Sequence, residues 1–406
     1  MNNSFVLLNR ELHDLYSNTE DVDSLKTQNP KLYNTLVEHG FIISDDFDEV
    51  SHLEFEKKKS KFDRSLYHIV VNPTLDCNLS CWYCYEKKQA NSAISQEVIE
   101  GIKKNIVAHD EQSPFRTLKL SFFGGEPFMQ FGAIKDLSSF ASDFCKTNKK
   151  SFILDFTTNG SLIKQEQLDA LSQFPCMFQI TLDGNRKQHN KIKFTNDRAI
   201  DTYQLTLNNI KHILDTIDNC FVAIRINFDA KTLKYFDDIL EDIKGFDRKR
   251  VKIILKKIWQ VDNNQIDKEY LLDAILKLFD HQFIVDYYTQ GGLCFGELLN
   301  EAIVNYDGKV FKCTTIEDFN DTNSYGHLNT QTGEIVWNHK LSTIGYDLTT
   351  DKCKKCKLYP SCFGPCTLHL MNGDDACFID SLNLSMDEYL MFMYKNEMTR
   401  RRIFNS

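Results

Sequence analysis

The run His68-Ile-Val-Val-Asn-Pro-Thr-Leu-Asp-Cys77-Asn-Leu-Ser-Cys81-Trp-Tyr-Cys84 joins a strand-like segment to a loop with three closely spaced cysteines. Most iron–sulfur proteins hold a [4Fe–4S] cluster with four thiolates. Three thiolates at spacings of four and three residues can hold three corners of such a cube and leave the last iron open. An open iron implies that another molecule binds there. Taken alone, however, the triplet could also form half of a zinc site.

The cysteine content points to metal binding inside the cell. The chain has 406 residues, enough for two or three domains, and 13 of them are cysteines. We expect no signal peptide and no membrane partner, because the N-terminus lacks a basic region and no apolar run approaches ~18 residues. A cytoplasmic protein rarely forms disulfides, so metal ligation is the leading explanation. The net charge of −9 argues against a general nucleic-acid binder.

Between residues 67 and 265, strand-like runs alternate with segments long enough for helices. Repeated β-then-α units predict a parallel sheet with helices outside. In barrel-like α/β folds the chemistry lies at the C-terminal strand ends, so one mouth could gather the loops there. The expected strands are Tyr67–Val71, Leu118–Phe123, Phe152–Thr157, Phe178–Leu182, Cys220–Phe228 and Val251–Lys256. The expected helices are Ser95–Ala108, Ile134–Thr147, Ile163–Phe174, Thr202–Asp215 and Lys231–Ile243.

The cysteine loop and several later motifs together resemble the radical S-adenosylmethionine (SAM) enzymes. Tyr83 precedes the last cysteine of the loop. Phe123-Gly-Gly-Glu-Pro127 resembles the family's GGEP loop, whose backbone receives the amino group of SAM. The strand ends Thr157-Thr-Asn-Gly160, Ile180-Thr-Leu-Asp-Gly184 and Arg225-Ile-Asn227 resemble later segments that contact the cofactor. Their order and spacing fit one another, so the resemblance favours a cluster over a zinc site.

The resemblance implies a fold, a cofactor and a reaction. The fold would be α/β: a partial (β/α)6 TIM-like barrel with a small N-terminal domain and a cysteine-rich C-terminal SPASM domain. Cys77, Cys81 and Cys84 would ligate a [4Fe–4S] cluster, and the open iron would be chelated by SAM. The reduced cluster would cleave SAM to a 5′-deoxyadenosyl radical that abstracts hydrogen from a C–H bond. No catalytic residue is assigned beyond the cluster; the implied cofactor-binding residues are Tyr83, Gly124, Gly125, Glu126, Pro127, Asn159, Thr181, Asp183, Lys193, Arg225 and Asn227.

One departure from the family pattern concerns the carboxylate of SAM. Related enzymes often carry His-Asp-x-x-Arg after the Asp-Gly pair, and that arginine pairs with the carboxylate. This chain has His189-Asn-Lys-Ile-Lys193 at that place. Lys193 can supply charge, but a lysine cannot reproduce the bidentate fork of an arginine. We interpret His189 as structural.

Seven cysteines from position 294 onward form a second pattern. Cys294-x13-Gly308-x4-Cys313, then Cys353-x2-Cys356-x5-Cys362-x3-Cys366, then Cys377, closely resembles the SPASM extension of radical SAM enzymes. By this resemblance Cys353, Cys356, Cys362 and Cys377 would ligate one auxiliary [4Fe–4S] cluster, and Cys294, Cys313 and Cys366 a second. Zinc is the alternative metal. Because Phe295–Lys312 contains no cysteine, we hypothesise that the second cluster is open to a substrate atom such as a peptide thiolate.

The remaining cysteines, Cys145, Cys176 and Cys220, lie in or beside expected helices and strands, so we interpret them as buried core thiols.

Hairpin signals lie at Tyr306–Val310 and Thr332–Val336. The expected domains are residues 1–66 (N-terminal module), 67–290 (radical SAM partial barrel), 291–383 (SPASM) and 384–406 (C-terminal helix).

Residues 1–66 contain no cysteine and show helical periodicity, with a short strand expected within His39–Ser44. The module is a candidate for leader-peptide recognition, by addition of the leader as a strand at a sheet edge, or it merely caps the barrel. The run Lys57–Lys61 could attract an acidic leader, although salt would screen the attraction.

The SPASM subgroup mostly modifies peptides or proteins. We therefore expect a maturase that installs a thioether, C–C or C–O crosslink, or a related C–H modification, in a ribosomal precursor peptide. An electron donor such as flavodoxin or ferredoxin would reduce the cluster. The alternatives are an anaerobic sulfatase-maturating (formylglycine-forming) enzyme and a non-catalytic zinc-binding protein. The first is disfavoured because Thr314 follows Cys313, where sulfatase maturases usually carry an aspartate.

Overall fold

Eleven strands form one sheet in the computed structural model, in the order β11-β10-β9-β8-β1-β2-β3-β4-β5-β6-β7. The structure describes residues 5–258, 260–261, 266–287, 293–345, 349–371, 373, 377, 382 and 384–405. The strands are β1 (Leu66–Asn72), β2 (Thr117–Phe122), β3 (Ser151–Thr158), β4 (Cys176–Thr181), β5 (Cys220–Phe228), β6 (Val251–Lys257), β7 (Ile284–Asp286), β8 (Glu301–Asn305), β9 (Lys309–Phe311), β10 (Gly326–Leu328) and β11 (Ile335–Trp337).

The part of the sheet from β8 through β1 to β7 is parallel throughout. All six strands expected from the sequence are present, and the parallel arrangement of an α/β fold is confirmed. Buried apolar residues such as Ile69, Leu120 and Leu154 form neighbouring positions across β1, β2 and β3. Strands buried on both faces need helices on the outside, and a parallel register brings their C-terminal ends to one edge.

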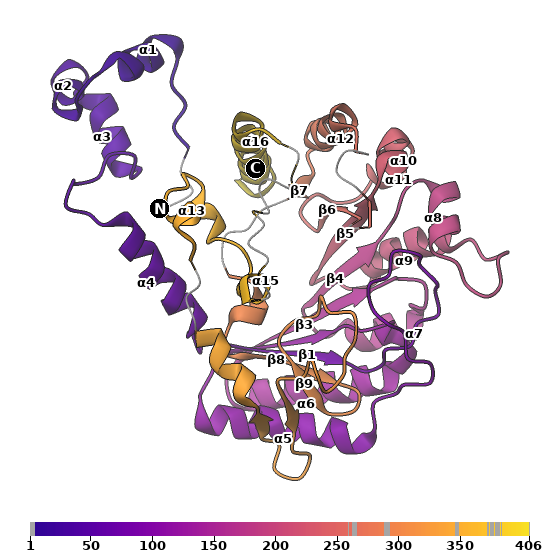
Figure 1. Cartoon of the computed structure of the whole chain (residues 1–406). Helices are drawn as coiled ribbons and strands as arrows, with labels where there is room; N and C mark the ends of the chain where they lie inside the picture. Colours follow the sequence, from indigo (N-terminus) through magenta and orange to yellow (C-terminus); the bar gives the residue numbers. More distant parts are fainter. Residues whose placement is uncertain are drawn as a thin grey trace. The chain divides into compact units, whose positions relative to one another are not determined.

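Helices follow most of the parallel strands and lie on the convex side of the curved sheet (Figure 1). One expected helix is divided: the segment 231–243 forms α10 and α11, because Tyr235 leaves the helical conformation between them. The helices of the barrel are α5 (Gln96–Gln112), α6 (Phe131–Thr147), α7 (Gln165–Leu171), α8 (Arg186–Ile192), α9 (Thr202–Thr216), α10 (Ala230–Lys234), α11 (Phe236–Ile243) and α12 (Lys268–Asp280), with the 3-10 turn η1 (Pro127–Gln130).

Beyond β8 the sheet continues as antiparallel strands. Both expected hairpins are present, as β8–β9 and β10–β11. Val70 of β1 packs with Ile303 of β8 and Phe311 of β9 in one buried cluster, so this extension shares a core with the barrel. The remaining elements of this part are the 3-10 turns η3 (Phe295–Glu297) and η4 (His339–Gly345) and the C-terminal helix α16 (Met386–Asn405).

The chain divides into two compact units. The larger takes its described residues from 62–289, 294–347 and 376–406, and the smaller from 1–61, 290–293 and 348–375. The cysteine pattern predicts one auxiliary domain over residues 291–383, and those boundaries stay a prediction. The helices of the smaller unit are α1 (Arg10–Asn18), α2 (Val22–Gln28), α3 (Pro30–Glu38), α4 (Glu49–Lys61), α13 (Asp351–Lys354), α14 (Tyr359–Cys362) and α15 (Thr367–Met371).

The N-terminal module contains four helices, and the strand expected within residues 39–44 is wrong. Gly40 takes a φ of 69°, and the amides of Phe41 and Ile42 donate to the carbonyl of Leu36 at 2.8 and 3.3 Å. These amides therefore complete the end of α3 and are not available for a strand partner. Ile42 instead packs against the small core of Leu25, Leu32 and Leu36.

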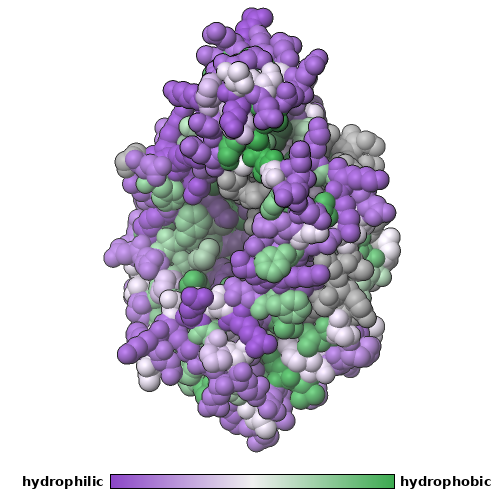
Figure 2. All heavy atoms as spheres, turned by 90° about the vertical axis from the view of Figure 1, so that its left-hand side faces the viewer, coloured by the Kyte–Doolittle hydropathy of each residue, from purple (hydrophilic) through white to green (hydrophobic). Residues whose placement is uncertain are grey.

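No helix among the described residues is long and apolar enough to cross a membrane. On the face that Figure 2 presents, hydrophobic side chains form separate spots within a mostly hydrophilic surface. In α4, Lys57 and Lys61 are buried, so only Lys58 and Lys59 of the basic run are exposed.

Candidate functional site

The C-terminal parts of β3, β4, β5 and β6, together with segments that follow β1, β2, β3, β4 and β6, line a cavity of about 160 Å³ in the larger unit. Eleven residues predicted from the sequence lie in its wall: Cys77, Cys81, Tyr83, Cys84, Gly124, Gly125, Asn159, Thr181, Lys193, Arg225 and Asn227. Three other predicted residues, Glu126, Pro127 and Asp183, are buried but do not line the cavity. The structure therefore brings together residues that are spread over 150 positions of the chain, from 77 to 227.

Two glycines let the loop after β2 lie directly against the cysteine loop. Gly124 has a φ of +97°, which side chains rarely adopt, and a Cβ there would overlap the carbonyl oxygen of Thr74. A Cβ on Gly125 would overlap the carbonyl oxygen of Asp76. The amides of Gly125 and Glu126 donate to these same two carbonyls at 3.1 and 2.9 Å. No larger residue fits at either position without moving the cysteine loop.

Glu126 joins the glycine loop to the end of β3. Its side chain is fully buried, and burial raises the pKa of the carboxyl group. One oxygen accepts from the amide of Phe128 at 3.0 Å and from the hydroxyl of Thr158 at 2.7 Å, and the other accepts from the amide of Asn159 at 2.8 Å. Because these three donors satisfy the buried carboxyl group, we assign Glu126 a supporting position behind the cavity.

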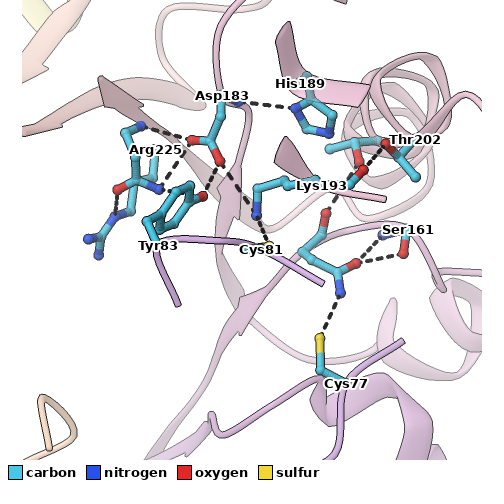
Figure 3. A network of polar contacts seen from close by, with 12 residues as sticks. Cys77, Cys81, Tyr83, Ser161, Asp183, His189, Lys193, Thr202 and Arg225 are labelled. Atoms are coloured by element: carbon cyan, nitrogen blue, oxygen red, sulfur yellow. Dashed lines mark hydrogen bonds and ion pairs between the residues drawn. The ribbon is translucent and has the colours of Figure 1, made fainter. Parts of the chain in front are cut away.

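Asp183, two residues after β4, is the centre of a second polar network (Figure 3). One carboxylate oxygen accepts from the backbone and side-chain amides of Asn227 at 3.0 and 3.1 Å, and the other accepts from the hydroxyl of Tyr83. The amide of Asp183 donates to Nδ1 of His189 at 3.1 Å. Burial first, and then the charge of Asp183, raises the pKa of Tyr83 well above its ordinary value. His189 is buried and orients this network, in agreement with a structural role.

Lys193 faces this network from the residue that follows α8. Its Nζ lies 3.7 Å from the carboxylate of Asp183 and 4.0 Å from Sγ of Cys81. Burial alone would lower the pKa of this ammonium group, but the facing Cys81, Tyr83 and Asp183 raise it well above its ordinary value. Lys193 therefore carries a buried positive charge beside the cysteine loop.

The three cysteines of the loop form no disulfide, and their surroundings fit an iron–sulfur cluster. Burial, followed by the charge of Glu126, raises the pKa of Cys77 to about 12, so its proton is held until a cation replaces it. The side-chain amide of Asn159 lies 3.7 Å from Sγ of Cys77. In the described ranges no three His, Cys, Asp or Glu side chains converge on one ion position. In a cube each cysteine ligates its own iron, so the thiolates need not meet at one point.

The cavity also contains residues that the sequence analysis missed, among them Glu86, Lys257 and Gln260. Burial raises the pKa of Glu86 to about 8. The side-chain amide of Gln260 donates to the carbonyl of Tyr83 at 3.0 Å, which ties the chain after β6 to the cysteine loop. No motif marks these positions; only their place just after a cysteine or a strand end could have indicated them.

The later cysteines are distributed over both compact units. Cys294 and Cys313 belong to the larger unit, where a Cβ on Gly296 would overlap the carbonyl oxygen of Lys312. Cys353, Cys356, Cys362 and Cys366 belong to the smaller unit, and Cys377 to the larger. Both predicted ligand sets stay predictions. By contrast, Cys145, Cys176 and Cys220 are buried in the barrel, as expected.

Residues 71–243 match the family model of the Radical SAM superfamily. Among curated proteins, the radical SAM cyclopropyl synthase TigE of Paramaledivibacter caminithermalis is 22% identical over 311 residues, 71% of this chain and 60% of TigE. The chain thus spans less than two thirds of the length of that relative. A cysteine-type anaerobic sulfatase-maturating enzyme of Clostridium novyi is 21% identical over 345 residues, 75% of this chain and 88% of the relative.

Two solved structures share the fold. The structure of native anSMEcpe with bound AdoMet and Cp18Cys peptide has a TM-score of 0.58 at 18% identity, covering 84% of this chain and 98% of that chain. The crystal structure of Streptococcus suis SuiB has a TM-score of 0.50 at 13% identity, covering 86% of this chain and 85% of that chain. At these identities the likeness is one of fold.

Proposed function

Since residues 71–243 form a radical SAM domain, we propose that this radical SAM enzyme is a maturase of ribosomally made peptides. The observation that carries the proposal is the cavity in which the cysteine loop, the glycine loop and the ends of β3, β4 and β5 meet. The family implies a [4Fe–4S] cluster and SAM, and this cavity collects the residue types that both would need.

Cys77, Cys81 and Cys84 would hold the cluster, and the backbone at Gly124 and Gly125 would lie against SAM, since glycines allow close approach. When bound and reduced, the cluster supplies an electron that cleaves SAM and yields a radical able to abstract hydrogen from a substrate C–H bond. The side chains and loops of the protein would orient the cluster and SAM and enclose them in the cavity. Glu126 fixes the glycine loop to the end of β3, and Asp183 fixes Tyr83 against Asn227.

A peptide substrate is supported by the relatives and neighbours. The anSMEcpe structure contains a bound peptide, and the relative in Clostridium novyi is named for sulfatase maturation. Thr314 stands after Cys313, where sulfatase maturases usually carry an aspartate, which favours a crosslink or related C–H modification over formylglycine formation. The product would be a thioether, a C–C bond or a C–O bond.

The proposal includes roles for the other regions. The seven later cysteines would hold two auxiliary [4Fe–4S] clusters, one of them open to the substrate, and a protein such as flavodoxin or ferredoxin would supply electrons. The N-terminal module would bind the leader of the precursor peptide. Because the described residues 5–61 contain helices and no strand, a leader would meet helix faces here. A content of 13 cysteines fits a reducing compartment in which disulfides are rare, so a cytoplasmic location is part of the proposal.

Anaerobic reconstitution with iron and sulfide tests the enzyme against the zinc-binding alternative. We expect about 12 irons per chain, which corresponds to three cubes, and release of 5′-deoxyadenosine from SAM after reduction. Cys81→Ala should abolish the release, because two thiolates no longer hold the cluster. Cys145→Ala, which alters a buried cysteine outside every predicted ligand set, should leave it unchanged. A chain that binds zinc and never releases 5′-deoxyadenosine would reject the proposal.

A further inference from the structure

The position of Lys193 suggests a role beyond cofactor binding. Its side chain is only 6% exposed, and its Nζ lies between the carboxylate of Asp183 at 3.7 Å and Sγ of Cys81 at 4.0 Å (Figure 3). A buried ammonium group normally needs a charge partner or a full set of hydrogen bonds. Here the contacts of Nζ are one carboxylate oxygen and the sulfur of a predicted cluster ligand.

Both ends of this lysine are fixed in place. The amide of Lys193 donates to the carbonyl of His189 at 2.7 Å, and its carbonyl accepts from the hydroxyl of Thr202 at 2.5 Å. At the other end, Asp183 is itself held by Asn227 and Tyr83. The ammonium group is therefore directed at Cys81 by the fold.

We infer that Lys193 tunes the predicted cluster by placing a fixed positive charge against the thiolate of Cys81, with Asp183 as its positioning residue. This inference rests on the proposed function. Reduction adds a negative charge to a cluster whose three thiolates already carry negative charge, and a nearby buried cation favours the reduced form. Cluster charge, hydrogen bonds to sulfur and solvent exposure are the means by which proteins set such potentials. Lys193 would thus raise the reduction potential even before SAM binds.

The test is the midpoint potential of this cluster, measured by EPR-monitored titration of the reconstituted full chain without SAM. Cys81→Ala identifies the signal that belongs to the loop, because that signal should disappear. K193M and K193Q remove the charge and should lower the potential by the equivalent of at least a tenfold change in the reduction equilibrium, about 59 mV for one electron. K193R keeps the charge and should stay near the original value.

Lys150 provides a matched control. It forms a similar pair with Asp110, at 2.7 Å and 12% exposed, but lies beside the N-terminal end of β3, the opposite end from the cavity. K150M should leave the potential unchanged. If K193M fails to load the cluster, the comparison of K193Q with K193R decides the matter, and equal potentials in those two variants would overturn the inference.

An unchanged potential together with weaker SAM binding in K193Q would also overturn it, because Lys193 would then serve the carboxylate of SAM alone. If no cluster signal is lost in Cys81→Ala, the proposed function itself fails, and this inference fails with it.

Discussion

The loop Cys77–Cys84 and the segment 349–371 both carry closely spaced cysteines, yet their backbones are built differently. Ser80 of the loop donates to the carbonyl of Phe194 at 2.9 Å, and Asn78 donates to Ser161 at 2.9 Å. These partners come from segments that follow parallel strands of a large sheet. The segment 349–371 instead consists of three helices of four or five residues each.

The two segments differ in the backbone that carries their cysteines. Helices of one turn are barely stable by themselves, because the free-energy cost of helix nucleation exceeds the stabilisation from one or two hydrogen bonds. Phe363, with a φ of 58°, and Gly364, with a φ of 85°, lie between α14 and α15. We expect the barrel to shape its loop before any cluster binds, whereas the segment 349–371 would gain order on binding the metal proposed for its cysteines.

The largest expected effect comes from disturbing the preformed loop. Gly125→Ala would drive a methyl group into the carbonyl of Asp76, and the backbone of the cysteine loop would have to move. Overpacking of this kind destabilises by about 1–3 kcal/mol. We expect release of 5′-deoxyadenosine to fall at least about 100-fold, since displacements of about 1 Å can have that effect on positioning.

Gly132→Ala is the control for that change. Gly132 lies in α6 with no atom near the added methyl group, so alanine should stabilise the chain by about 0.5–1 kcal/mol and leave activity intact. Both quantities follow from urea unfolding and a single-turnover assay. Full activity in Gly125→Ala would contradict the view that the two loops must touch.

A smaller effect is expected from comparing the chain before and after reconstitution with iron and sulfide. In the cluster-free chain, the amides of Cys356 and Cys362, which donate to Cys353 and Leu358, should exchange with deuterium rapidly. After reconstitution they should become protected, because each ligated cysteine closes a loop of the chain. The amides of β5 should be protected in both states. Hydrogen–deuterium exchange with mass spectrometry measures this, and equal protection of 349–371 in both states would remove the contrast between the two regions.

The smallest effect concerns pH and the barrel itself. His68 of β1 is buried beside Lys119 and Lys312, and its ring bonds Ser121 at 2.8 Å. Burial first, and then the two lysines, lower its pKa from 6.5 to about 3. The unfolded chain therefore binds a proton that the folded chain rejects. The stability due to neutral His68 is present above pH 6.5 and is lost as pH falls toward 3.

His68→Gln should remove this acid sensitivity. Between pH 7.5 and 5.5 the original chain should lose about 1 kcal/mol more stability than the variant, since one pH unit corresponds to about 1.4 kcal/mol per proton. Urea unfolding of the cluster-free chain at the two pH values measures the difference. Equal losses would show that His68 gains its proton without unfolding the sheet.

Much of this fold was predictable because its signals are local. Six buried strands, their connecting helices and both hairpins follow from runs of apolar residues and turn residues. Two expectations were wrong where a local backbone conformation differs from the one that the residue pattern indicates. The residues 41–42 look strand-like, but their amides complete the end of α3. Tyr235 interrupts one expected helix although no proline or glycine stands there.

The candidate site follows a similar division. The cysteine loop, the glycines and the strand-end residues carry sequence motifs, so their presence in one cavity could be predicted. The contacts of Lys193 could not be predicted from the sequence. Sequence comparison relates it to the carboxylate of SAM, while the structure places it against Asp183 and Cys81. Glu86 and Gln260 carry no motif and were found only through the cavity that they line.

The sequence by itself determined the alternation of strands and helices and the spacing of the thiolates. These depend on neighbours within a few positions of the chain. Only the tertiary structure decided which polar groups meet. Tyr83 and Asp183 are one hundred positions apart, and Lys193 reaches Cys81 across 112 positions. Such contacts depend on how parallel strands align, because the register sets which strand ends share an edge, and no local pattern encodes that distance.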